Sequence, residues 1–177
     1  ISCYKNVLHK RALHQMSDAI SSKKKYPVPM RQRSGARIAA VQLNFQHLFV
    51  SADLNSSISD FLIHYASDVA DDMQVKKIDN THFQRLVLGC DLHKNLIDNV
   101  ISSSLGEGWK IKRLSKADYT ILQVAICELK HIPHTPAKVV IAEYSNIADA
   151  YNSDVSFINA VLDKAARLLR TREMVAS

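Results

Sequence analysis

The sequence predicts an all-α protein, a helical bundle of two small subdomains with six to seven helices. The 177 residues include only 4 glycines and 4 prolines, which is too few for the turns of a loop-rich β-sandwich or barrel. Apolar residues recur at three- and four-residue spacing, the period of an amphipathic helix. Helix-capping signatures precede several of these stretches. The 47% of hydrophobic and 23% of charged residues are ordinary for a globular protein with a core.

Residues 1–34 are expected to form a basic, flexible tail. Pro27 and Pro29 follow three consecutive lysines, a composition that opposes a packed helix. The net charge is +6, and the first 37 residues hold nine lysines and arginines but one acid, so the remaining chain is slightly acidic. A basic arm on a near-neutral body indicates a polyanion partner, with nucleic acid as the leading candidate. The alternative is that Lys23–Lys25 only keep the chain soluble.

Three helices are expected in the first half of the chain. The first runs from Ala36 to about Ala52, and the second follows the capping box Ser57–Asp60 and ends near Met73. A third, longer helix is expected from about Thr81 to Ser102. Each of the three helices has one apolar face. In the first helix this face is Ile38, Val41, Phe45, Leu48 and Phe49, and in the second it is Phe61, Leu62 and Tyr65. In the third it is Phe83, Leu86, Val87, Cys90, Ile97 and Ile101.

A serine- and glycine-rich stretch, 102–108, separates the two halves. It divides an all-helical domain at 35–170 into subdomains at about 35–103 and 109–170. Residues 171–177 are expected to form a C-terminal tail.

Three further helices are expected in the second half. The capping box Ser115–Asp118 precedes a stretch, 121–127, that is apolar almost all round, so this helix should be the buried centre of its subdomain. Thr135 and Pro136 offer an N-cap followed by a proline at the first helical position. Ser153 or Asp154 can cap the last helix, whose apolar face is Ile158, Val161, Leu162, Ala165 and Leu169.

Enzyme, metal and membrane functions find no support in the sequence. The glycine-rich phosphate and dinucleotide motifs, the H-E-x-x-H zinc motif and the G-x-S-x-G hydrolase motif are all missing. We therefore expect no enzyme activity and no cofactor. His131 and His134 could hold a metal but more simply occupy an exposed turn around Pro133. No apolar run approaches the 18 residues of a membrane span.

Cysteine usage favours a reducing cytoplasm. Cys3, Cys90 and Cys127 are odd in number and widely spaced, which argues against a disulfide framework or a zinc ribbon. Trp109 follows the glycine-rich junction, and we expect it to fill space between the subdomains rather than stack on a nucleic-acid base.

The strongest local feature is an arginine cluster, Arg31, Arg33 and Arg37, that runs into the first amphipathic helix. Guanidinium groups suit RNA because they pair with phosphates through a rigid fork and also stack on unpaired bases. The cluster by itself is a weak signal.

This arm and helix resemble the opening of the NusB family of bacterial transcription antitermination factors, R-R-x-A-R-x-x-A-V-Q-x-L-Y. Later segments resemble the family in the same order, across residues 31–170. The matching residues are Ala36, Arg37, Ala40, Val41 and Gln42, with Phe45 for the family's Tyr; Gly89 and Ile97-Asp98; Arg113-Leu114, Asp118, Ile121-Leu122 and Glu128-Leu129; Pro136, Val140-Ile141 and Glu143; and Phe157–Lys164. Together these segments are highly specific.

The resemblance implies a NusB-like all-α fold of two subdomains. It also implies binding of the single-stranded boxA element of ribosomal RNA leader transcripts, in partnership with NusE, a protein of the small ribosomal subunit. The pair would join the RNA polymerase elongation complex. On this basis the RNA contacts would be Arg31, Arg33, Arg37, Gln42, Phe45 and Phe157, and the acids docking NusE would be Asp118, Glu128 and Glu143. Phe45 and Phe157 also fall on apolar stripes and suit a core role.

The chain departs from the family pattern at Tyr119, Ala142, Asp149 and Ala160, where the family has Arg, Asn, Lys and Gly. Two alternative functions remain at this point. One is a helical protein-interaction bundle that has lost RNA binding. The other is the related helical domain of a ribosomal RNA cytosine methyltransferase.

Overall fold

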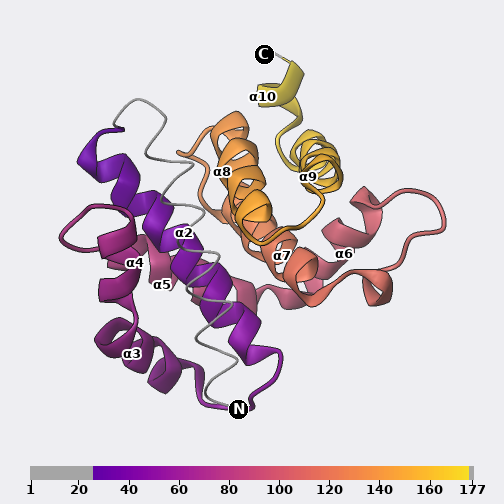
Figure 1. Ribbon diagram of the computed structural model, residues 1–177. Coiled ribbons are helices and arrows are strands. Elements are labelled where there is room, and N and C mark those ends of the chain that lie inside the picture. The colour runs from indigo at the N-terminus through magenta and orange to yellow at the C-terminus, as the bar shows by residue number, and fades with distance from the viewer. Residues whose placement is uncertain (1–25, 176–177) are drawn as a thin grey trace.

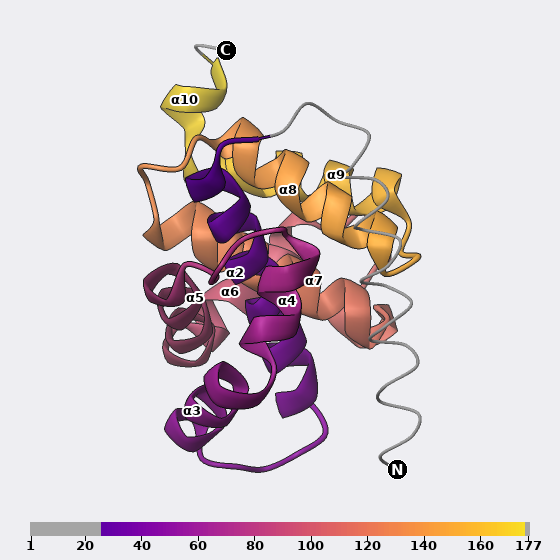
Figure 2. The same cartoon turned by 60° about the vertical axis from the view of Figure 1, so that its left-hand side comes forward.

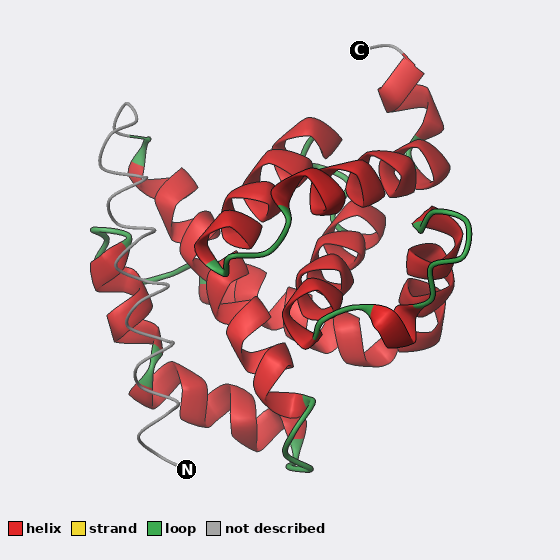
Figure 3. Cartoon of the chain, turned by 45° about the vertical axis from the view of Figure 1, so that its right-hand side comes forward, coloured by secondary structure: helices red, strands yellow, loops and turns green. Residues whose placement is uncertain are grey.

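The computed structural model describes residues 26–175, and all regular structure in that range is helical (Figures 1 and 3). The expected all-α fold is therefore confirmed. The helices are α2 (Val28–His47), α3 (Leu54–His64), α4 (Ala66–Asp72), α5 (Asn80–Leu92), α6 (Lys94–Ser104), the 3-10 helix η1 (Ile111–Arg113), α7 (Lys116–His131), α8 (Ala137–Ala150), α9 (Val155–Leu169) and α10 (Thr171–Val175).

Helix α2 begins earlier than its sequence pattern predicts. Its first residue is Val28, so residues 28–34 are helical and do not belong to a tail. Pro27 takes the N-cap position and Pro29 lies in the first turn, where a missing N–H removes no intrahelical hydrogen bond. The prolines therefore start the helix. Residues 1–25 of the predicted basic tail, with Lys23–Lys25, lie outside the described residues.

Two expected long helices are each divided at a single residue. Tyr65 separates α3 from α4, and His93 separates α5 from α6. The start of α3 also differs from the prediction, because Asp53 caps it by accepting a hydrogen bond from the Ser56 N–H at 2.8 Å. The helix therefore begins at Leu54, before the Ser57–Asp60 signature.

Helix α7 lies at the centre of the molecule. Ser115 caps it as expected, accepting a hydrogen bond from the Asp118 N–H at 3.0 Å. Every residue from 119 to 129 is buried, because α7 packs against α2, α5, α6, α8 and α9 (Figures 1 and 2). The predicted buried central helix is thus confirmed, and its neighbours come from both halves of the chain.

The two ends of the second half contact each other. Pro136, not Thr135, is the N-cap residue of α8, and it offers no side-chain cap. The Ala137 N–H instead donates to the Glu173 carboxylate at 2.6 Å. Residues 171–175 form α10 rather than a tail, and this short helix supplies a cap that is distant in sequence. Asp154 caps α9 through the Phe157 N–H at 3.0 Å.

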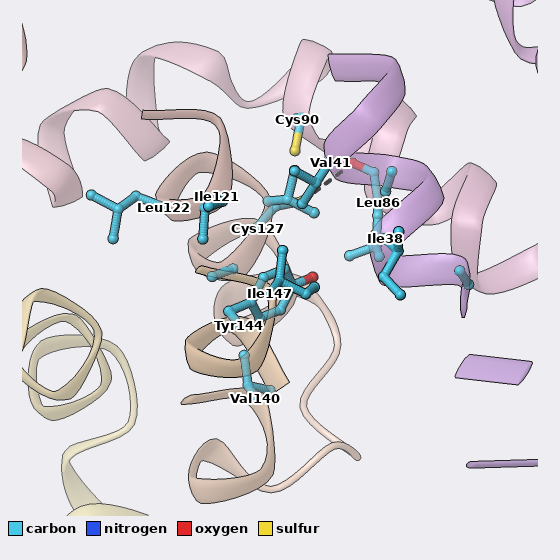
Figure 4. Packing of buried hydrophobic residues seen from close by; sticks show 14 of the residues in the cluster. Ile38, Val41, Leu86, Cys90, Ile121, Leu122, Cys127, Val140, Tyr144 and Ile147 are labelled. Atoms are coloured by element: carbon cyan, nitrogen blue, oxygen red, sulfur yellow. Dashed lines mark hydrogen bonds between the residues drawn. The ribbon is translucent and has the colours of Figure 1, made fainter. Parts of the chain in front are cut away.

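One hydrophobic cluster unites the helices. Figure 4 shows Ile38 and Val41 of α2 beside Leu86 and Cys90 of α5 and Cys127 of α7. Helix α6 packs against α7 and α9 as well as α5. The core therefore continues across the expected boundary at 103–109.

Candidate nucleic-acid interface

Arg31 lies in the second turn of α2 and reaches across to the end of α4. Its Nη1 donates to the carbonyl oxygens of Met73 at 3.1 Å and Gln74 at 2.8 Å. The last carbonyls of a helix have no partner within the helix, so Arg31 closes this end. Its side chain is only partly exposed. Arg31 thus stabilises the contact between α2 and the end of α4.

Arg33 is the most accessible of the three arginines. Its side chain is 45% exposed, and its Nε lies 3.6 Å from a carboxylate oxygen of Asp79. The other Asp79 oxygen caps α5 by accepting from the His82 N–H at 3.0 Å. Such an exposed, long ion pair contributes little to stability. Arg33 can therefore release Asp79 for another anion at low cost.

Arg37 lies in the core, which corrects the expectation that it contacts RNA. Its guanidinium holds Glu128 through two hydrogen bonds, Nε–Oε2 at 2.9 Å and Nη2–Oε1 at 2.7 Å. The two side chains are 4% and 0% exposed. In this conformation neither RNA nor a partner protein can reach them. The expectation that Glu128 docks a partner is corrected for the same reason.

The Arg37–Glu128 pair is the centre of a buried polar network. Tyr144 donates its hydroxyl to Glu128 at 2.9 Å, and His82 Nε2 lies 3.3 Å from the same carboxylate. Arg37 Nη1 also contacts Glu143 at 3.2 Å. Ser34 donates its hydroxyl to the same Glu143 oxygen at 2.6 Å. The network joins α2, α5, α7 and α8.

Opposing effects act on the ionisable groups of this network. Burial alone would raise the pKa of Glu128, but hydrogen bonds from His82 and Arg37 and their charges outweigh it and lower the pKa to about 2. Burial, then the negative charge of Glu128, raises the pKa of the Tyr144 hydroxyl. Glu128 is therefore an ionised carboxylate at neutral pH.

Gln42 and Phe45 differ in accessibility. Gln42 is buried and close to Tyr151, whose pKa rises to about 12 because burial outweighs the opposing hydrogen bond from Gln42. Gln42 therefore does not meet the expectation of a surface RNA contact. Phe45 is half-buried, and its ring lies 5.2 Å from that of Phe49, which is exposed. The end of α2 thus presents an aromatic pair.

Phe157 lies in the first turn of α9 and is half-buried. Its ring lies 5.3 Å from the ring of Trp109, which is 51% exposed. The Arg113 guanidinium carbon lies 5.8 Å from the Trp109 ring centre. Trp109 is therefore not an enclosed plug. An aromatic residue among the interleaved cations of 109–113 is the sequence signal for this cluster.

The three acids expected to dock a partner do not form one surface. Glu128 is in the core, and Glu143 lies at its edge with its side chain 25% exposed. Asp118 lies in the first turn of α7, ten residues or about 15 Å along the helix from Glu128. Its Oδ1 is buried without a hydrogen bond, although the residue is partly exposed.

Within residues 26–175, no three His, Cys, Asp or Glu side chains are grouped so that they could hold a metal ion. His131 stacks on His93 with ring centres 3.9 Å apart. Partial burial, then the charges of His93 and Lys130, lowers the pKa of His131. In the same part of the chain, no helix combines the length and the apolar character that a membrane crossing requires.

The model of the NusB family matches residues 34–167. The chain belongs to the NusB family. The transcription antitermination protein NusB of Bradyrhizobium sp. (strain BTAi1) is 31% identical over 165 residues, covering 88% of this chain and 98% of the relative. The same protein of Rhodopseudomonas palustris (strain HaA2) is 29% identical over 89% and 98%. The solved structure of T. maritima NusB has a TM-score of 0.64 and 27% identity, and the match covers 87% of this chain and 100% of that one.

One departure from the NusB pattern has a clear structural setting. Tyr119 stands where the pattern has Arg, and its hydroxyl donates to Asp98 at 2.8 Å. Lys94 donates to the Tyr119 oxygen at 3.0 Å and to the second Asp98 oxygen at 2.8 Å. Tyr119 and Lys94 together satisfy both carboxylate oxygens of Asp98.

Proposed function

We propose that this chain is a transcription antitermination factor of the cytoplasm. It binds boxA-like single-stranded RNA of ribosomal RNA leader transcripts together with NusE and joins the RNA polymerase elongation complex. In this proposal the protein acts only by binding its partners, and it has no catalytic activity and no cofactor. The observation that carries this proposal is the family match over residues 34–167, with relatives named as antitermination proteins matched along nearly their whole length.

Arg33 is the main phosphate contact of the proposed RNA surface. An exposed guanidinium with a weak ion pair can release Asp79 and contact a phosphate. Phe45 and Phe157 offer half-buried rings for stacking on unpaired bases. Arg31 contributes its positive charge at the start of α2, but its hydrogen bonds to α4 limit its reach. Arg37 and Gln42 support this surface from the interior.

The decisive experiment compares a boxA-like RNA with a scrambled RNA of equal length, each with and without NusE, by fluorescence anisotropy of labelled RNA. The proposal predicts tighter binding of the boxA-like strand and a further gain when NusE is present. Equal affinity for both strands under all conditions would contradict it. A protein that binds NusE but neither RNA would be an interaction bundle without an RNA role.

Of the three acids expected to dock NusE, Asp118 is the best candidate. Glu128 is enclosed in the core, and Glu143 already contacts Ser34 and Arg37. We expect Asp118→Asn to weaken the NusE complex and to reduce its salt sensitivity, since a basic ribosomal protein would lose one attractive charge. Asp149→Asn, an exposed acid on α8, is the matched control. Titration calorimetry at two salt concentrations measures both effects. An unchanged complex for Asp118→Asn would exclude this residue.

A further inference from the structure

The α6–α7 loop holds an exposed tryptophan in a defined position. Trp109 is the sole tryptophan of the chain and is 51% exposed. Its backbone N–H donates to the Gly106 carbonyl at 3.1 Å, and Gly108 takes the left-handed conformation at φ 77° that glycine favours. The 3-10 helix η1 follows directly. The loop thus forms a turn that presents a large aromatic ring to solvent.

The ring is supported from within the molecule. Phe157 of α9 packs against it with ring planes tilted by 33°. Arg113 lies on the ring at 5.8 Å, and its Nη1 donates to the Gly108 carbonyl at 3.4 Å. A ring held by a second aromatic and a cation loses little freedom when a planar ligand stacks on it.

The surroundings of the ring are cationic. Lys110, Lys112, Arg113 and Lys116 are all exposed, and Glu107 is the single acid between 105 and 116. The nearby Asp154 is engaged as the cap of α9. Trp109 is also the only exposed large hydrophobic residue between 97 and 138. One isolated aromatic among cations suits a base with its phosphates better than the apolar core of a protein interface.

We propose that Trp109, Phe157 and Arg113 form a stacking site for one unpaired base of single-stranded RNA. The base stacks on Trp109, while Arg113 and the loop lysines contact the neighbouring phosphates. This inference rests on the proposed RNA-binding function and adds two residues, Trp109 and Arg113, to its surface. Figure 1 shows the α6–α7 loop and the start of α2 on opposite sides of the molecule, so the bound strand has to cross its face.

The single tryptophan makes the test direct. Intrinsic fluorescence of the full chain is followed while a short boxA-like RNA is added, and binding is measured in parallel by anisotropy of labelled RNA. Stacking should quench Trp109 along the same saturation curve as the anisotropy. A strand with abasic positions keeps its phosphates, and it should bind more weakly and quench less.

Variants identify the interaction. Trp109→Ala should weaken RNA binding by about 5- to 150-fold, the range expected for loss of one stacked base. Trp109→Phe should restore most of the affinity, because every aromatic face can stack. Tyr65→Ala, which removes a 44% exposed ring from the α3–α4 junction, is the matched control and should bind RNA normally.

The outcomes separate this inference from the proposed function. RNA binding without quenching, and with Trp109→Ala at full affinity, would overturn the stacking site and leave the function intact. Failure of the unmodified protein to bind RNA would overturn both. Weaker binding of NusE instead of RNA by Trp109→Ala would mark the ring as a protein contact and contradict the inference.

Discussion

At the scale of single residues, the most informative pair is Arg37 and Glu128. They lie 91 positions apart in sequence and meet through two hydrogen bonds in the core. Both belong to segments that resemble the NusB pattern, one in the arm and one in the E-L segment of α7. A buried bidentate pair explains these two pattern positions through folding, without any contact to RNA. Arg33, four residues before Arg37, retains the exposure that a phosphate contact needs.

Arg37→Met should lower the free energy of unfolding by about 3–5 kcal/mol, because Glu128 would remain as a buried charge without its main partner. Combining Arg37→Met with Glu128→Gln should cost less than the sum of the single changes. Arg33→Met is the matched control, and its exposed ion pair should change stability by less than about 1 kcal/mol. Urea unfolding of the four variants measures these values. Equal losses for Arg37→Met and Arg33→Met would contradict the buried network.

The same pair gives the protein an acid-sensitive stability. The folded-state pKa of Glu128, about 2, lies below its ordinary value of 4.5, so the unfolded chain takes up a proton first as the pH falls. Its contribution, on the order of 3 kcal/mol, is complete above pH 4.5 and is lost as the pH falls towards 2. Urea unfolding at several pH values should show a shallower loss over this range for Glu128→Gln. Parallel curves for both proteins would place the acid sensitivity elsewhere.

At the scale of helices, the close contact of α5 with α7 depends on Gly89. A Cβ at Gly89 would lie 2.7 Å from the Cys127 sulfur, closer than real side chains approach. The two helices also exchange weak thiol hydrogen bonds, from Cys90 to the Gln123 carbonyl at 3.8 Å and from Cys127 to the Leu86 carbonyl at 3.7 Å. The glycine of the NusB pattern thus marks a helix–helix contact.

Gly89→Ala should destabilise the protein by about 1–2 kcal/mol, because overpacking exceeds the gain in helix propensity. In a Cys127→Ala background the same change should be neutral or stabilising by up to about 1 kcal/mol, since the sulfur is gone. A double-mutant cycle by urea unfolding gives the coupling between the two sites. Identical effects of Gly89→Ala in both backgrounds would show that this contact does not control the packing.

At the scale of the whole molecule, the sequence was sufficient for the helical class and for several caps. Ser115 caps α7 as predicted, and Asp154, one of the two residues predicted for α9, caps that helix, because capping is a local property of a few residues. The breaks at Tyr65 and His93 were not predictable, since apolar periodicity continues across them without glycine or proline. The cap of α8 by Glu173 and the burial of Arg37 depend on residues distant in sequence. Local patterns carry no information about such partners.

In the candidate site, too, the local pattern was predictable, and the contacts with residues distant in sequence were not. Arginine spacing placed Arg33 and Arg37 on one helix face, but their exposures differ because Glu128 and Glu143 enclose only Arg37. The RNA surface that we propose comprises Arg33, Phe45 and Phe157, and the proposed stacking site adds Trp109 and Arg113. This surface draws on both halves of the chain, which the continuous core holds in place.

We propose that RNA is attracted through Arg33 and not through Arg37, and the salt dependence of RNA affinity is the sharpest check of the Arg33 contact. A boxA-like strand is titrated at several salt concentrations against the unmodified protein, Arg33→Ala and the control Arg85→Ala, an exposed arginine on α5. Each phosphate contact contributes a slope of about −0.7 for single strands, so Arg33→Ala should bind more weakly with a slope flatter by about 0.7. Arg85→Ala should match the unmodified protein. Equal affinity and equal slope for Arg33→Ala and the unmodified protein would show that Arg33 makes no phosphate contact.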